Sequence, residues 1–319
     1  MFEKDVIPIS VSTLMPGSAC GLDLYQTEPN SDSLVLYRGA GYPLAPSDLV
    51  RLKERGIHRL YIAKESQGRY QKHLRQLASA PLDDLEIPMV ARLGAMDAVV
   101  RDVLSRSLGS DDSATSVSAA LQLAKIVSQT VTSNGFTTND LFSVLQHDYT
   151  TFTHSANVAF YCAILANKLG FSPVDVEQIT AAGLLHDLGK LEISEQILCK
   201  PGKLNEAEFR EIKKHPLTGF RKLANRPELS FGQLMTVYQH HERLDGKGYP
   251  VGCACDEIHP WAKLCSIVDV FEALTSQRPY RQPMAKQKAL DLQNRDSGTA
   301  FDPEMLSCWN SIIQNDLNP

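Results

Sequence analysis

Apolar and polar positions alternate in two different ways along the chain, and the change divides it into two parts. Short β-branched or aromatic runs at 6–11, 34–37 and 60–62 are separated by Pro, Gly and Asn, which predicts strands joined by turns. From about residue 138 onward strand patterns nearly vanish, and helix start and stop signals follow one another. The pattern predicts an α+β fold class, with a small mixed α/β N-terminal domain followed by an all-α helical bundle.

Helix signals also appear before the change. We expect one helix to begin with Ser47 as its N-cap and to end at Gly56, and an amphipathic helix to cover residues 93–104. The Ser- and Asp-rich stretch 109–118 is typical of a loop. The predicted organisation is an N-terminal α+β domain at 1–80, a linker with connecting helices at 81–137, and a helical domain at 138–319.

Capping residues mark three helix starts in the second half of the chain. Ser172, followed by a proline and by Asp175, predicts a helix that runs to His186. Asn205 with Glu208, and Ser230 with Gln233 three residues later, predict two further helices that open with capping boxes.

Composition narrows the class of protein. The chain has 319 residues, 43% of them hydrophobic and 22% charged, which is ordinary for a globular protein and argues against disorder. A formal charge of -5 lacks the basic surplus that nucleic-acid binding requires. No window is long and apolar enough for a membrane span, the N-terminus carries charges and a proline, and seven irregularly spaced cysteines fit a reducing compartment. We therefore expect a cytoplasmic protein.

Histidines and aspartates gather in the helical half. A single histidine on an apolar helix is usually a hydrogen-bonded core residue, but burying this many imidazoles without partners would be costly. Divalent Fe, Mn, Zn or Ni would remove that cost, and the number of donors supports two ions with positions left open for water and substrate. Two such ions about 3.5–4 Å apart neutralise a phosphoryl group and activate water, so phosphoester hydrolysis is the natural reaction. The seven candidate ligands are His154, His186, Asp187, His215, His240, His241 and Asp269.

Four blocks of this region resemble one known family, the HD-GYP phosphodiesterases of the HD phosphohydrolase superfamily. They stand in the family's order, and the resemblance covers about residues 138–315. The N-terminal part resembles, more weakly, a poorly characterised domain that precedes this module in some members. The resemblance thus implies an N-terminal α+β regulatory domain at 1–80 and an HD-GYP catalytic domain at 138–319. The blocks are HDLGK at 186–190, the dipeptide His215-Pro216 followed by Gly219, HHERLDGKGYP at 240–250, and DVFEALTSQRPYR at 269–281.

The resemblance implies an HD-type helical bundle that hydrolyses cyclic di-GMP to pGpG and in many members onward to GMP. It implies that the seven residues are the metal ligands and that Asp187 bridges two ions. Lys190 would contact the scissile phosphate or protonate the leaving oxygen. Arg278 and Arg281 would hold the ligand's phosphates, although a solvated charged loop is the alternative reading. Gly248 and Tyr249, together with Gly246, would form the loop beside the substrate, or else a purely structural turn.

Two positions depart from the family's pattern. Thr150 stands where members with three metals carry a glutamate, and Asp148 and His147 are poorly placed to replace it, so we predict two metals. Glu272 stands where aspartate is more usual, and its longer side chain is expected to alter hydrogen bonding around Asp269.

Other readings stay open at this point. The chain could bind cyclic di-GMP with negligible turnover and signal through a protein partner at its N-terminal domain or GYP loop, it could cleave another cyclic dinucleotide, and it could form a homodimer. Cys253, Cys255 and His259 could form a separate metal or redox site, but they lack a fourth ligand, and unpaired loop cysteines are the simpler interpretation. Glu242 and Asp245 are expected to orient the histidines or the loop.

Overall fold

The computed structural model describes residues 5–15, 17, 21–28, 33–78, 80, 87–108, 113–133, 145, 151–276 and 282–317. These residues form two compact units, one up to Val99 that also includes Leu145, and one from Val100 onward. The predicted connecting segment, 81–137, therefore contributes to both units. A small antiparallel sheet lies in the first unit and helices make up most of the second, which confirms the α+β layout.

The first unit contains a four-stranded antiparallel sheet with the strand order β1-β4-β2-β3. The predicted strands near residues 6, 34 and 60 are present, whereas β2 was not predicted because its four residues carry no β-branched run before the final threonine. The strands are β1 (Val6–Ser10), β2 (Leu24–Thr27), β3 (Leu34–Arg38) and β4 (Arg59–Ala63).

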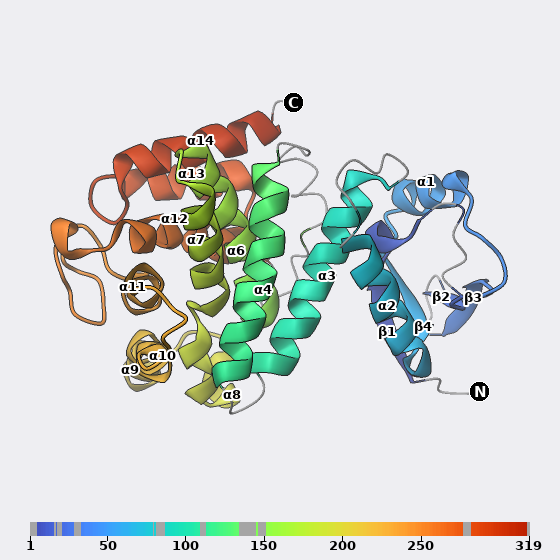
Figure 1. The fold of residues 1–319 in the computed structure, drawn as a ribbon, viewed down its shortest axis with the longest axis horizontal. Coiled ribbons are helices and arrows are strands. Elements are labelled where there is room, and N and C mark those ends of the chain that lie inside the picture. The colour runs from blue at the N-terminus through green and yellow to red at the C-terminus, as the bar shows by residue number, and fades with distance from the viewer. Residues whose placement is uncertain are drawn as a thin grey trace. The chain divides into compact units, whose positions relative to one another are not determined.

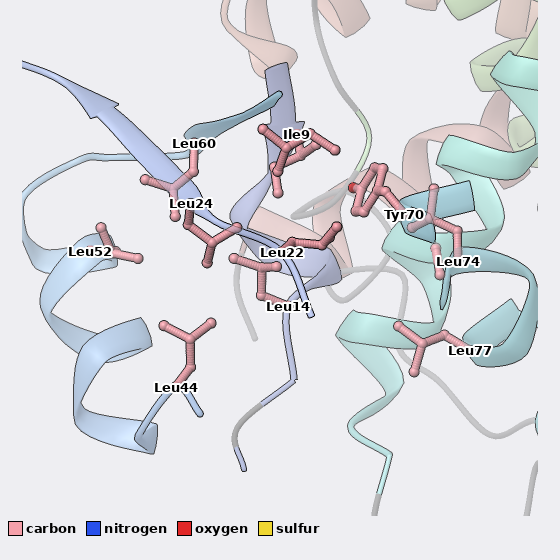
Figure 2. Packing of buried hydrophobic residues seen from close by; sticks show 12 residues of the cluster. Ile9, Leu14, Leu22, Leu24, Leu44, Leu52, Leu60, Tyr70, Leu74 and Leu77 are labelled. Atoms are coloured by element: carbon pink, nitrogen blue, oxygen red, sulfur yellow. The ribbon is translucent and has the colours of Figure 1, made fainter. Parts of the chain in front are cut away.

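Two helices, α1 (Pro46–Glu54) and α2 (Gln67–Ala78), complete the core of this unit. Leu52 of α1 and Tyr70 and Leu74 of α2 are buried in one cluster with leucines and isoleucines of the sheet, as Figure 2 shows. The cluster also includes Ile9, Leu14, Leu22, Leu24, Leu44, Leu60, Ile62, Leu77 and Ala95.

The prediction of Ser47 as the N-cap of α1 was wrong. The N-cap is Ala45, because Pro46 takes the first helical position and the Asp48 carboxylate accepts a hydrogen bond of 2.9 Å from the Ala45 backbone N–H. The predicted end is confirmed, since Gly56 adopts a left-handed conformation with φ of +68°.

Long helices follow. The predicted amphipathic helix lies within α3 (Met89–Leu108), and α4 (Ser113–Thr132) comes next. The predicted loop 109–118 was wrong from Ser113 onward, because Val117 is buried with the apolar residues that follow it along α4, and burial of this face outweighs the weak helix propensity of the serines.

The second unit is helical in its described residues (Figure 1). The three predicted helix starts are confirmed: the Ser172 hydroxyl accepts from Asp175 N–H, and capping boxes open α9 and α11. None of the helices that the structure describes is long and apolar enough to cross a membrane. The helices are α6 (Thr151–Lys168), α7 (Pro173–Leu185), α8 (Glu195–Leu198), α9 (Glu206–Ile212), α10 (His215–Leu223), α11 (Phe231–Gln239), α12 (Pro260–Thr275), α13 (Lys286–Arg295) and α14 (Pro303–Leu317).

α6 and α7 are joined by the short segment 169–172 and pack side by side, with α4 alongside α7 (Figure 1). Their close approach depends on Gly183 of α7. A Cβ atom at this position would lie 2.9 Å from the Cα of Ala159 and 3.3 Å from the Sγ of Cys162, both on α6. The glycine therefore sets the spacing of the two helices.

We predict that Gly183→Ala lowers the free energy of unfolding by about 1–3 kcal/mol, because backbone atoms of α6 must move to admit the methyl group. Urea unfolding followed by circular dichroism measures the change. Gly68→Ala is the matched control: Gly68 lies in α2 with nothing within 4 Å of the added Cβ, so alanine should leave stability unchanged or raise it slightly. Equal effects of the two substitutions would contradict the packing argument.

Candidate functional site

His186 and Asp187 follow directly after α7, and His154 lies in the first turn of α6. Because the two helices form a hairpin, the start of α6 and the end of α7 come together, and the rings of His154 and His186 lie 5.2 Å apart between centroids. His186 Nδ1 donates to the backbone carbonyl of Gly183 at 2.8 Å, since a carbonyl can only accept. Its Nε2 atom is buried and has no hydrogen-bond partner among the described residues.

Two more ligand candidates are oriented in the same way. His215 opens α10, and its Nδ1 donates to the carbonyl of Ile212 at 2.7 Å. His240 caps the C-terminus of α11, and its Nδ1 lies 3.0 Å from the carbonyl of Val237. With Nδ1 held by the backbone, the Nε2 atoms of His215 and His240 face each other at 3.2 Å.

The Asp187 carboxylate lies between two groups of histidines, with one oxygen toward each. Oδ2 is 3.4 Å from Nε2 of both His154 and His186. Oδ1 is 3.2 Å from Nε2 of His215 and 3.8 Å from Nε2 of His240. This arrangement is the one that a carboxylate bridging two cations would need.

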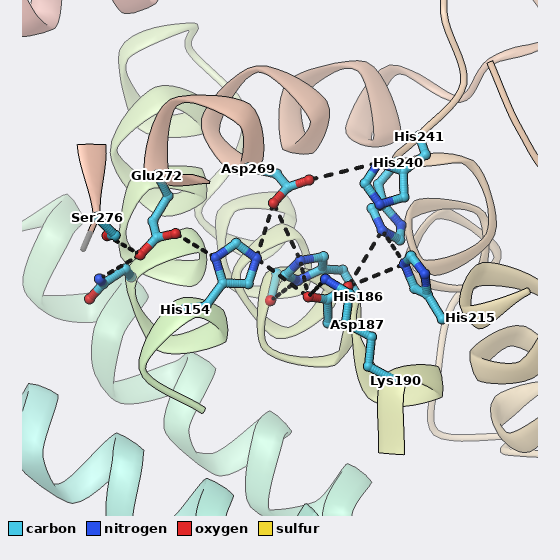
Figure 3. A network of polar contacts seen from close by, with 12 residues as sticks. His154, His186, Asp187, Lys190, His215, His240, His241, Asp269, Glu272 and Ser276 are labelled. Carbon is cyan, nitrogen blue, oxygen red and sulfur yellow. Dashed lines mark hydrogen bonds and ion pairs between the residues drawn. The ribbon is translucent and has the colours of Figure 1, made fainter. Parts of the chain in front are cut away.

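Asp269, in the middle of α12, supplies a second buried carboxylate. Its Oδ1 lies 3.0 Å from Nε2 of His154, and its Oδ2 lies 3.9 Å from Nδ1 of His241. All seven predicted ligands therefore meet at one place, drawn from five separate segments, as Figure 3 shows. Their donor atoms form two groups, each within 4.8 Å: His154, His186 and Asp269, and Asp187, His215, His240 and His241.

Burial and neighbouring charges shift the pKa values of the histidines in opposite directions. Burial lowers the pKa of His186 and of His240, and it lowers that of His241 to about 3. Burial also acts to lower the pKa of His154, but the charge of Glu272 and contacts with Asp187 and Asp269 outweigh it and raise this pKa well above its usual value.

The two aspartates stay ionised in spite of their burial. Burial alone would raise the pKa of Asp187, but Lys190 and the neighbouring histidines hold it well below its usual range. Asp269 behaves in the same way: burial alone would raise its pKa, but the hydrogen bond with His154 and the charges of the neighbouring histidines together hold it well below its usual range. Two buried carboxylates beside imidazoles, of which those of His186, His240 and His241 are kept neutral by burial, form a donor set suited to divalent cations of the first transition series. The site thus fits divalent metal.

Lys190 lies in the 3-10 turn η3 (Leu188–Glu192), and its Nζ contacts Asp187 Oδ2 at 2.5 Å. The side chain is 14% exposed, so the ammonium group sits at the edge of the cluster rather than in bulk water.

The Tyr249 ring stacks on the His241 ring, with centroids 4.7 Å apart and an interplanar angle of 28°. Burial, followed by the charges of Asp269 and Asp187, raises the pKa of its hydroxyl, which therefore stays protonated. Gly248 lets this loop pack closely, since a Cβ there would lie 2.4 Å from the Cα of Glu242. The Glu242 carboxylate accepts from the N–H of Val251 at 2.7 Å, which anchors the loop as expected.

Asp245 also orients the loop, through contacts with Arg243 and the N–H of Lys247. Other predictions concern residues outside the described ones: Arg278 and Arg281 of the proposed phosphate contacts, and Thr150 with its neighbours Asp148 and His147.

Cys253, Cys255 and His259 belong to none of the metal-binding groups found within the described part of the chain. Nδ1 of His259 accepts from the N–H of Trp261, which makes this histidine the N-cap of α12. Cys255 Sγ lies 3.6 Å from Nζ of Lys263. Ordinary capping and loop contacts account for these residues.

One contact was not anticipated. Glu272 was expected to act near Asp269, but its Oε2 lies 2.5 Å from Nδ1 of His154, and its Oε1 accepts from Asn157 and Ser276. The spacing gave a partial signal, because Asn157 follows His154 by three residues and Ser276 follows Glu272 by four, which places each pair on one helix face.

Comparison with known proteins supports this picture. The family described as "HD domain" matches residues 140–305. A solved structure, an HDG"Y"P protein from Bdellovibrio bacteriovorus, aligns with a TM-score of 0.71 over 97% of this chain and 100% of that chain, at 21% sequence identity. At this identity the likeness concerns the fold.

Curated relatives match about half of the chain. A protein of Vibrio cholerae named 3'3'-cGAMP-specific phosphodiesterase 3 is 40% identical over 169 residues, which are 50% of this chain and 35% of that protein. Cyclic di-GMP phosphodiesterases of Pseudomonas aeruginosa and Thermotoga maritima are each 36% identical, over 51% and 53% of this chain and 39% and 48% of their own lengths. The chain thus spans less than half the length of these relatives.

We predict that the metal-free protein loses stability as the pH falls from 7 to about 4.5. His186, His240 and His241 have lowered pKa values when folded, so below about pH 6.5 the unfolded chain takes up protons that the folded chain does not. Each such histidine contributes up to about 1.4 kcal/mol per pH unit. Urea unfolding at several pH values measures the slope.

His154 opposes this slope only near the start of the window. Its raised pKa adds stability that is gained as the pH falls from 7 through the unfolded value and is complete below it, whereas the lowered pKa values of Asp187 and Asp269 lose stability in the same direction as the slope, near and below about pH 4. His241→Gln should make the slope shallower by one histidine's share. A protein that became more stable on acidification would contradict the assignment of neutral buried imidazoles.

Proposed function

This chain belongs to the HD domain family, as one of its HD-GYP proteins, and we propose that it is a metal-dependent phosphodiesterase that hydrolyses cyclic di-GMP to pGpG. The observation that carries the proposal is the Asp187 carboxylate, with one oxygen toward each of two groups of buried histidines. Further hydrolysis of pGpG to GMP is compatible with the same site.

The seven residues of the two groups would hold two divalent ions, Fe, Mn, Zn or Ni, with Asp187 shared between them. When bound, such ions supply Lewis acidity toward a phosphoryl group and lower the pKa of water. The histidines serve this arrangement by presenting neutral Nε2 atoms, which the carbonyl contacts of His186, His215 and His240 favour.

Lys190 has two roles in the proposed reaction. Water attacks phosphorus in line with the departing 3′ oxygen, so that one P–O bond forms, one breaks, and a proton passes to the leaving oxygen. The ammonium group of Lys190, at the edge of the cluster beside Asp187, would bind the scissile phosphate and donate that proton. Asp187 keeps Lys190 in position through their ion pair.

The remaining proposed substrate contacts come from the loops. Gly248 and Tyr249 lie beside His241, where the stacked ring leaves the tyrosine hydroxyl available as a donor and lets the loop border the substrate. Arg278 and Arg281, outside the described residues, are proposed to hold the phosphates through bidentate contacts.

The cyclic dinucleotide 3'3'-cGAMP is a second candidate substrate, because a relative with 40% identity is named for it. Both cyclic dinucleotides present the same phosphodiester to the metal ligands and differ in one base. A module that binds cyclic di-GMP with little turnover, and signals through a partner or a homodimer, is the other reading, and the same assay separates it from an enzyme.

We predict that metal-loaded protein converts cyclic di-GMP to pGpG, and that 3'3'-cGAMP is cleaved more slowly. Chromatography of the products over time measures both rates. The variant with His186→Ala and Asp187→Ala should show neither turnover nor full metal content, because it loses one ligand and the shared carboxylate. Intact cyclic di-GMP after prolonged incubation with the metal-loaded wild type would contradict the enzyme proposal.

We predict that Lys190→Met lowers kcat by about 100- to 10,000-fold, the range expected for loss of a general acid. Metal content should not fall, since removing a cation beside Asp187 favours bound metal ions. Steady-state kinetics and elemental analysis check the two statements. Lys222→Met is the control: Lys222 pairs with Glu192 and contacts no candidate ligand, so its removal should leave kcat unchanged. Loss of metal in Lys190→Met would argue against the assigned role.

A further inference from the structure

Glu272 has a buried carboxylate whose two oxygens take part in three hydrogen bonds. Its Oε2 lies 2.5 Å from Nδ1 of His154, while its Oε1 accepts from Asn157 Nδ2 at 3.0 Å and from Ser276 Oγ at 2.6 Å. The residue is 1% exposed. The carboxylate is therefore held rigidly, with one oxygen committed to a candidate metal ligand, as the left side of Figure 3 shows.

Three other ligand histidines, each with a described hydrogen bond at Nδ1, are supported differently. His186, His215 and His240 donate to backbone carbonyls, which are neutral acceptors. A carboxylate is a stronger acceptor, and it increases the electron density of the imidazole more than a carbonyl does. His154 thus differs from these three histidines in the partner behind its ring.

The two donor groups consequently differ in charge. His154 belongs to the group with His186 and Asp269, so this group has one carboxylate within it and a second behind its histidine. Asp187 belongs to the group with His215, His240 and His241, but its Oδ2 faces His154 and His186, and Lys190 contacts this same oxygen. The additional carboxylate hydrogen-bonded to Nδ1 of His154 is therefore what distinguishes the first group from the second.

We propose that Glu272 is a positioning residue that acts through His154 on one of the two metal positions and makes the two positions inequivalent. This inference rests on the metal pair of the proposed function. Glu272 accepts a hydrogen bond from Nδ1, favours the tautomer that presents Nε2 as the donor atom for a metal ion, and aims the ring at the group with His186 and Asp269. The position near His215 does not depend on it.

The neutral replacement Glu272→Gln is expected to reverse the tautomer of His154. The position of Oε1 receives two donors, from Asn157 and Ser276, so the amide oxygen remains there and the NH₂ group faces His154. His154 must then accept at Nδ1 and carry its proton on Nε2, which is the wrong tautomer for a ligand. Glu272→Asp keeps the charge on a shorter side chain and should retain most of the affinity.

The test measures metal binding without turnover. Full-length protein freed of metal is dialysed against increasing Mn²⁺, and bound manganese is measured by elemental analysis. Two ions are expected in the wild type, and in Glu272→Gln one of them should bind about 10- to 100-fold more weakly while the other is unchanged. Glu208→Gln is the control, since Glu208 contacts Lys200 and Asn205 and no candidate ligand, so both ions should bind normally.

Combining Glu272→Gln with a second substitution, in either group of ligands, identifies which metal position it affects. In His215→Ala, which is expected to keep an ion at the first group, Glu272→Gln should weaken that ion and change the d–d absorption spectrum of bound Co²⁺. In His154→Gln, whose amide can still donate to Glu272, adding Glu272→Gln should have no further effect on the remaining ion. Circular dichroism monitors folding, and Glu272→Asp, with a smaller loss at the same position, serves as the test if the glutamine variant does not fold.

Equal weakening of both ions, an unchanged affinity in Glu272→Gln, or the same loss in the His154→Gln background would overturn the inference. None of these results affects the proposed phosphodiesterase activity, which the product assay measures separately. A wild type that binds no Mn²⁺ and cleaves no cyclic dinucleotide would instead remove the proposed function, and with it the basis of this inference.

Discussion

The carboxylate of Asp187, withdrawn from water and shared between two groups of imidazoles, is the interaction on which the helical unit depends. Charges in such surroundings are costly unless opposite charges and hydrogen bonds compensate them. Lys190 provides part of this compensation, and the remaining need is what makes the cluster suited to cations. The packing around it follows from the same requirement: a Cβ at Gly189 would lie 2.0 Å from the carbonyl oxygen of His215, so the absence of a side chain there brings Asp187 and His215 together.

Several helices and one loop together orient the candidate metal ligands. Helix ends supply carbonyls to three histidines, α12 supplies Asp269 and Glu272, and the loop after α11 supplies the aromatic ring that packs on His241. The three carbonyls belong to last helical turns, which leave such groups without a partner inside the helix, so the bundle contributes these hydrogen bonds to the site at little cost to its own stability.

Much of this could be predicted from the chain. Helix starts at Ser172, Asn205 and Ser230 were correct because a capping side chain and the backbone N–H that donates to it are close in sequence. The seven candidate ligands were recognised because their residue types and blocks are distinctive. The Asp48 cap of α1 and the early start of α4 were missed, since backbone hydrogen bonds and burial decided them. The partner of Glu272 could not be derived, because α6 and α12 are far apart in sequence and no local pattern gives their register.

The order of the ligands along the chain has a consequence for how the protein folds. His154 lies on the first helix of the hairpin and Asp269 on α12, and the histidines of the other group lie between them. A cation held by His154 and Asp269 would connect two helices that are more than a hundred residues apart, and it would bind the folded chain because the unfolded chain does not bring these donors together. Coordination would then be coupled to tertiary assembly, and a fragment that ends before α12 lacks Asp269.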